Sequence, residues 1–71
     1  MDVQRLVAMA NDIAAFFDSE PDASVAAEGV RLHLRKFWEP RMRREIVAYV
    51  AGGGAGLTTT AREAVKRLST S

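Results

Sequence analysis

Two parts of this chain have residue types and spacings that could serve phosphate or calcium binding. The run GGGAG at residues 52–56 resembles a phosphate loop, in which glycines let backbone amides approach the anion. No predicted strand precedes the run and no Lys-Ser or Lys-Thr pair follows it, so a flexible linker between helices is the favoured interpretation. The acids Asp18, Glu20 and Asp22 alternate as in a calcium loop. The glycine and the distant glutamate that such a loop requires are missing.

Catalytic and metal-binding side chains are equally sparse. His33 is the only histidine and cysteine is absent, so neither a histidine-pair nor a thiolate metal site can form. A histidine beside apolar neighbours such as Phe37 is more typical of the edge of a core than of a catalytic base. We therefore expect no catalytic residue, no cofactor site and no metal site in this chain.

Charge is unevenly distributed, although the formal net charge is only +1. Residues 1–30 contain six acids and one base, whereas residues 31–44 contain six bases and one acid. The basic segment 31–44 lies in a predicted helix–turn–helix, which makes a small nucleic-acid-binding regulator the second hypothesis. A pI of about 8.3 is below the strongly basic range of such modules. Attraction between the two charged regions within one fold is the alternative to a basic docking patch.

The spacing of apolar residues supplies the elements that would carry these side chains. Intervals of three and four recur along the chain and predict helices, and no segment alternates with period two for long enough to predict a strand. Asp2 suits an N-cap, Pro40 suits the first position of a helix, and Gly52 suits a left-handed C-terminal cap. The prediction is an all-α fold, a small bundle of three to four short helices at about 3–17, 23–38, 40–51 and 58–68.

A single domain over residues 1–71 is expected, with a Gly-rich linker at 52–57 and a frayed tail at 69–71. The second helix should bury Phe37 together with Ala26, Val30 and Leu34, and Trp38 should pack at the joint with the third helix. A chain of this size buries only about 60% of its unfolded surface. A hydrophobic content of 48% is generous for so small an interior, and part of it is expected at an interface.

Several apolar residues lie off the main stripes of the helices. Met9 and Phe16 widen the apolar arc of the first helix, while Val25, Gly29 and Leu32 point away from the main face of the second. Glycine costs about 1 kcal/mol of helix propensity relative to alanine, but it lets another backbone approach closely. Isolated exposed apolar residues are common, so a partner surface is one of two explanations. The predicted docking residues are Met9, Phe16, Val25, Gly29, Leu32, Arg35, Arg41, Arg43 and Arg44.

The setting that the composition favours is the cytoplasm. Absence of cysteine is typical of a reducing intracellular environment. The first residues lack the order of a signal peptide, and no run approaches the roughly 18 apolar residues that cross a membrane. We expect neither a membrane nor a nucleic acid as partner.

Three strings of residues, in this order along the chain, carry a family resemblance: MANDIAAFF at 9–17, HLRKFWEPRM at 33–42 and AGGGAGL at 51–57. Together they resemble the delta subunit of the soluble NAD-dependent formate dehydrogenases over about residues 3–68. The central string is the specific part. Asp12 departs from an expected glutamine, Glu39 from the more usual aspartate, and Thr58-Thr59 from a common Asp-Pro helix start. These departures concern the strength of the helix caps.

The resemblance implies a non-catalytic accessory subunit of a cytoplasmic complex that oxidises formate to carbon dioxide and reduces NAD. In that family the alpha subunit holds a bis-pterin molybdenum or tungsten cofactor and iron–sulfur clusters. The beta and gamma subunits carry electrons through flavin to NAD. The delta subunit binds no cofactor, and it is expected to dock on the alpha subunit and support its assembly, cofactor loading or stability. The resemblance transfers no catalytic residue to this chain.

Overall fold

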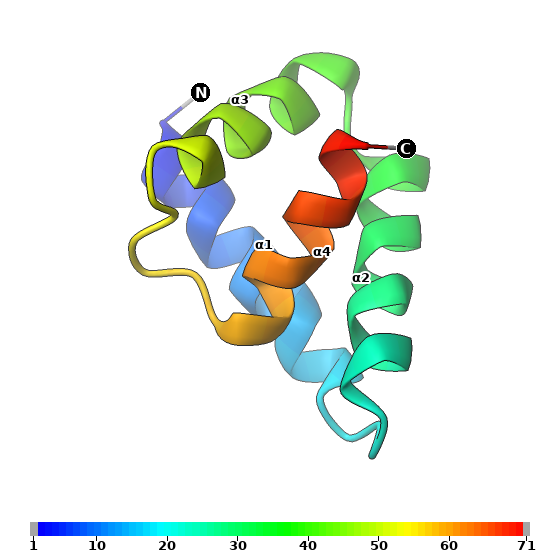
Figure 1. The fold of residues 1–71 in the computed structure, drawn as a ribbon. Coiled ribbons are helices and arrows are strands. Elements are labelled where there is room, and N and C mark those ends of the chain that lie inside the picture. Colours follow the sequence, from blue (N-terminus) through cyan, green and yellow to red (C-terminus); the bar gives the residue numbers. More distant parts are fainter. Residues whose placement is uncertain (1, 71) are drawn as a thin grey trace.

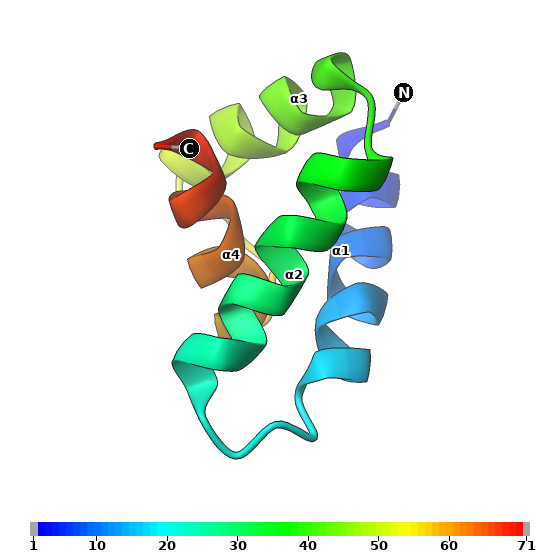
Figure 2. The same cartoon turned by 90° about the vertical axis from the view of Figure 1, so that its right-hand side faces the viewer.

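The computed structural model describes residues 2–70, which form four α-helices and no strand (Figure 1). Helices α1 and α2 lie side by side and antiparallel, α3 crosses one end of this pair, and α4 packs against the other three (Figure 2). The predicted all-α bundle is confirmed. The helices are α1 (Val3–Phe17), α2 (Ala23–Phe37), α3 (Pro40–Ala51) and α4 (Thr59–Ser69).

Helix ends follow from local capping chemistry. The Asp2 carboxylate accepts a hydrogen bond from the Gln4 amide at 3.1 Å, which confirms the predicted N-cap of α1. Pro40 opens α3 as predicted, because its missing N–H would have no helical partner there. At the other end of the chain, the tail that we expected to fray contributes Ser69 to α4 and Thr70 as its C-cap. Ser71 lies outside the described residues.

Small apolar residues line the interior where the helices meet. Ala10 and Ala14 of α1 and Ala61 and Ala64 of α4 are fully buried. Alanine removes little conformational entropy on burial and lets neighbouring backbones come close. Larger side chains fill the remaining space, and those that are completely buried are Leu6, Val30, Leu34, Ile46 and Val65.

The joint between α2 and α3 is closed by Trp38, as predicted. Trp38 leaves α2 in an extended conformation (φ −84°, ψ 141°) and is only 5% exposed. The guanidinium of Arg43 holds the same turn, since its Nη1 donates to the carbonyl oxygens of Trp38 and of Arg35, the latter at 3.1 Å. These hydrogen bonds satisfy carbonyls at the end of α2 that have no helical partner.

The prediction that Phe37 belongs to the core is wrong. Its side chain is 64% exposed and lies against His33, with ring centroids 4.7 Å apart. The helical pattern points Phe37 inward, but α2 ends at this residue and the chain turns there. Trp38 therefore fills the space beneath the joint that periodicity assigned to Phe37.

The glycine-rich segment after α3 is bent at later positions than predicted. Gly52 has φ −86° and is not the left-handed cap. Positive φ values occur instead at Gly53 (126°), Gly54 (67°) and Gly56 (88°). Residues other than glycine would be strained in this backbone conformation. The amide of Gly54 donates to the carbonyl of Tyr49 at 3.0 Å, and this hydrogen bond caps the C-terminal end of α3.

Side chains from three helices tie the 52–57 segment down, although we expected it to be a flexible linker. The side chain of Asn11 in α1 makes two hydrogen bonds at 2.9 Å: Nδ2 donates to the carbonyl of Gly56, and Oδ1 accepts from the amide of Thr58. The Tyr49 hydroxyl donates to the carbonyl of Ala55 at 2.6 Å, and Arg62 donates to that of Leu57 at 3.2 Å. The loop thereby fixes where α4 begins.

We predict that Trp38→Ala lowers the free energy of unfolding by about 3–5 kcal/mol, as large aromatic deletions in a core do. A domain of this size without cross-links has about that much stability in total, so the variant should be largely unfolded. Phe37→Ala is the matched control, because Phe37 is the adjacent aromatic residue and its ring is mostly exposed. Urea titrations followed by circular dichroism compare the two. Equal effects of both changes would contradict the buried joint.

We also predict that Asn11→Ala destabilises the chain by about 1–2 kcal/mol, the typical value for two lost hydrogen bonds. Asp12→Ala is the control, since Asn and Asp have similar helix propensities and Asp12 is exposed. Hydrogen exchange of the Thr58 amide provides the local measurement. Its protection should fall in the Asn11 variant alone, and unchanged protection there would rule out the clamp.

Candidate functional site

Most of the predicted docking residues lie on two separate surfaces. The first, here called the apolar face, comprises the exposed side chains Phe16, Val25, Leu32 and Phe37, with one hollow between α1 and α2 and another between α2 and α4. The second, here called the basic groove, lies between α3 and the C-terminal ends of α2 and α4. The sequence did not indicate this division, because it depends on how α3 crosses the bundle.

The apolar face exposes large side chains on two neighbouring helices. Phe16 is 78% exposed, while Val25 and Leu32 are each about half exposed. Val25 and Leu32 are one heptad apart and therefore lie on the same side of α2. Phe16 stands edge-on against Phe17, with centroids 5.4 Å apart. Phe37 adds to the exposed apolar area and was missed by the sequence analysis, which assigned it to the core.

Two shallow hollows interrupt the apolar face. One is lined by Ile13, Phe16, Phe17 and His33. The other is lined by Val25, Gly29 and Leu32 together with three polar neighbours, Ser24, Glu28 and Arg67. The ring of Phe17 contacts Gly29 and so connects the two hollows.

Two of the predicted docking residues have roles inside the chain. Met9 is half-buried and packs against the core. A Cβ atom on Gly29 would lie 2.6 Å from Cδ1 of Phe17, closer than carbon atoms approach. The space beside Gly29, where we expected a partner backbone, is therefore filled by the Phe17 ring of the same chain. Gly29 permits α1 and α2 to pack closely.

An ion-pair network borders the apolar face on its α4 side. Arg31 donates to both carboxylate oxygens of Glu28, one of them at 2.9 Å, and this hydrogen bonding lowers the pKa of Glu28 and raises that of Arg31. Arg67 reaches across from α4, donates to the carbonyl of Ser24 at 3.0 Å and lies 3.6 Å from Glu28. These charges join α2 to α4 within the chain.

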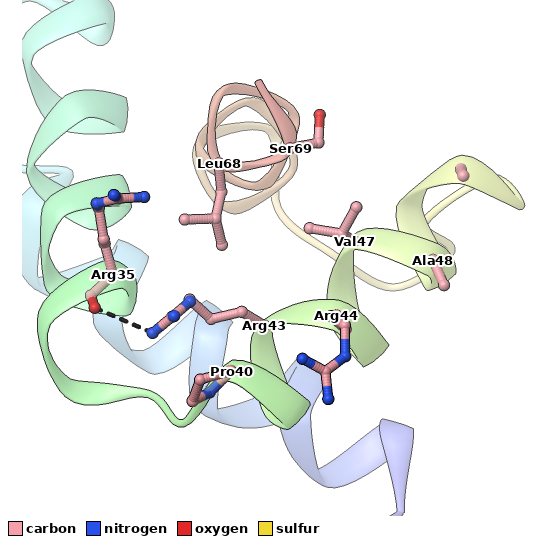
Figure 3. A pocket seen from close by; sticks show the side chains of 9 residues that line it. Arg35, Pro40, Arg43, Arg44, Val47, Ala48, Leu68 and Ser69 are labelled. Atoms are coloured by element: carbon pink, nitrogen blue, oxygen red, sulfur yellow. Dashed lines mark hydrogen bonds between the residues drawn. The ribbon is translucent and has the colours of Figure 1, made fainter. Parts of the chain in front are cut away.

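The basic groove combines arginines with apolar walls (Figure 3). Its volume is about 580 Å³, and Arg35, Arg43 and Arg44 line it. Leu68 points toward it from α4 and Val47 from α3. The other lining residues are Pro40, Ala48, Ala51 and Ser69. No acidic residue is among these described lining residues.

Arg41, the fourth predicted basic docking residue, lies outside this groove. It lines a separate hollow with Glu39, Met42 and Glu45. Its Nε is 3.7 Å from a carboxylate oxygen of Glu45, one turn later on α3. The side chain of Arg41 is 76% exposed, so this pair is a weak surface interaction.

The acids considered as calcium ligands accept hydrogen bonds within the chain instead. The Asp22 carboxylate accepts from the Ser24 amide at 2.9 Å and caps α2. Asp18 accepts from the Thr60 hydroxyl at 2.6 Å, and Glu20 accepts from the Asp22 amide. Within residues 2–70, no three potential metal-ligating side chains of His, Cys, Asp or Glu come together.

One further geometric finding concerns membranes. The longest helices have 15 residues, and none of the helices in the described part of the chain has the length and apolar character needed to cross a bilayer.

Comparison with protein-family models gives a match over most of the chain. The family model described as NADH-dependent formate dehydrogenase delta subunit FdsD matches residues 5–65, a range that includes parts of all four helices. No curated protein and no solved structure matches the chain.

Proposed function

Because the chain belongs to the family of NADH-dependent formate dehydrogenase delta subunits, we propose that it is a non-catalytic accessory subunit of such a complex. It docks on the large alpha subunit in the cytoplasm and supports assembly, cofactor loading or stability of that subunit. The observation that carries the proposal is the family match over most of the chain. In this proposal the bis-pterin metal cofactor, the iron–sulfur clusters and the flavin belong to the alpha, beta and gamma subunits.

The apolar face supports docking as the mode of action. Phe16 is 78% and Phe37 64% exposed. A chain of this size has a small interior, yet these two large apolar rings lie outside it. Each Å² of apolar surface removed from water contributes about 25 cal/mol, so covering these rings together with Val25 and Leu32 favours binding. A partner that binds only the folded chain also stabilises it by mass action.

The nucleic-acid hypothesis receives less support. Three basic residues share one groove with apolar walls, and one of them, Arg43, is engaged by backbone carbonyls of its own chain. Arg67 and Arg31 are paired with Glu28. A nucleic-acid-binding surface of this size would be expected to present a broad basic stripe instead.

We predict that deletion of this chain leaves the formate-oxidising subunit present but poorly active. Metal content per alpha subunit and formate-dependent NAD reduction are measured on the purified complex, with and without the chain. Reduced metal content or faster loss of activity on storage is the expected result. A deletion strain with fully metallated, fully active enzyme of normal durability would contradict an accessory role.

Leu32→Asp tests the apolar face. If the face is covered in the complex, the new carboxylate is buried there without a partner, which costs at least about 2 kcal/mol of binding, or roughly 30-fold in affinity. The isolated variant should fold normally because Leu32 is about half exposed.

Ala8→Asp is the matched control for Leu32→Asp, since Ala8 is exposed on α1 and lines neither surface. Co-purification of the large subunit with each variant is measured, together with the melting temperature of each free chain. Equal co-purification of the two variants would mean that docking does not cover Leu32.

A further inference from the structure

The basic groove concentrates positive charge at one place where three helix ends meet. Arg35 comes from the last turn of α2, Arg43 and Arg44 from the first turns of α3, and Leu68 and Ser69 from the end of α4. Figure 3 shows Arg43 held beneath Leu68, with Arg44 at the α3 edge of the groove. The guanidinium groups of Arg43 and Arg44 share one hollow, and an anionic occupant would lower the repulsion between them.

The geometry of Arg43 makes the groove partly preorganised. One of its nitrogens, Nη1, is committed to the carbonyls of Arg35 and Trp38. This fixes the guanidinium plane, whose remaining N–H groups can donate to a carboxylate. Arg44 is exposed and can complete the contact. Fixing one arginine in advance reduces the entropy that binding must remove.

The walls of the groove identify the class of occupant. Pro40, Val47, Ala48 and Leu68 are apolar and line the same hollow as the arginines. A small inorganic anion would leave these walls wet, and a phosphate backbone would offer them no apolar group. A protein segment that carries carboxylates beside an apolar side chain matches both features.

From this complementarity we propose that the basic groove binds an acidic segment of another subunit in the same complex, with one of its apolar side chains against Val47 and Leu68. The inference rests on the proposed function for the existence of a partner, and adds the contact surface and its chemistry. The groove is separate from the apolar face, so the two surfaces give the chain two points of attachment, with α2 contributing Leu32 to one and Arg35 to the other.

Charge reversal on α3 tests the groove. Arg44→Glu alters the groove, whereas Arg41→Glu makes the same change on the same helix outside it. We expect Arg44→Glu to weaken co-purification of the complex by about tenfold or more, as charge reversal in a complementary interface does. Arg41→Glu should have less than about a twofold effect. Both free chains are melted to show that neither change unfolds the protein.

A photo-crosslinking amino acid at Ala48, an exposed position that lines the groove, identifies the occupant. Illumination of the complex followed by mass spectrometry should give an adduct with a peptide of another subunit that contains several Asp or Glu residues. An adduct with a peptide free of acids, or equal co-purification of the two arginine variants, would overturn the proposal. Retention on duplex DNA that is lost in Arg44→Glu, with unchanged co-purification, would overturn it in favour of nucleic acid.

Failure of the proposed function gives a different result. In that case the unaltered chain retains no subunit of the complex, and the variants cannot differ from it. The groove proposal fails by itself when the unaltered chain retains the complex and Arg44→Glu retains it equally well.

Discussion

Every other helix of this chain depends on α4 to cover its inner side. The buried residues of α4 face α1, α2 and α3 together, so the core is complete only when this last helix occupies the angle between the others. That requirement explains why several side chains hold the segment before α4 in place. Asn11 and Tyr49 hold the 52–57 loop from α1 and α3, and Arg67 joins the last turn of α4 to α2. With one small core and no disulfide, the position of α4 decides whether the bundle forms.

The sequence predicted the features that depend on near neighbours. Asp2 and Pro40 act at helix ends within one turn of the chain, and the spacing of Val30 and Leu34 is enough to place them inside. Features that depend on distant parts of the chain were not predictable in this way. The hydrogen bonds of Asn11 reach Gly56 and Thr58, which lie 45 and 47 positions later in the chain. Nothing in the sequence around Asn11 distinguishes it from an ordinary exposed asparagine.

The errors at Phe37 and Gly52 have a shared physical origin. Phe37 is the last residue of α2 and Gly52 is the C-cap of α3, and at such helix ends the sequence pattern does not show where the backbone leaves the helix. At the first site the turn sends Trp38 inward and leaves Phe37 outside. At the second the chain continues in a helix-like conformation for one more residue before the left-handed glycines. Arg41 was grouped with Arg43 and Arg44 because the three are close in sequence, although α3 directs Arg41 to another side.

The order of the helices has a consequence for synthesis on the ribosome. Translation proceeds from the N-terminus, so α1, α2 and α3 leave the ribosome before α4 does. During that interval Leu6, Val30 and Ile46, which are fully buried in the finished fold, lack the helix that covers them. The nascent chain therefore exposes this apolar surface until α4 has also left the ribosome. Chaperones or a partner subunit that meet the chain at this stage encounter a different surface from the one that the finished protein displays.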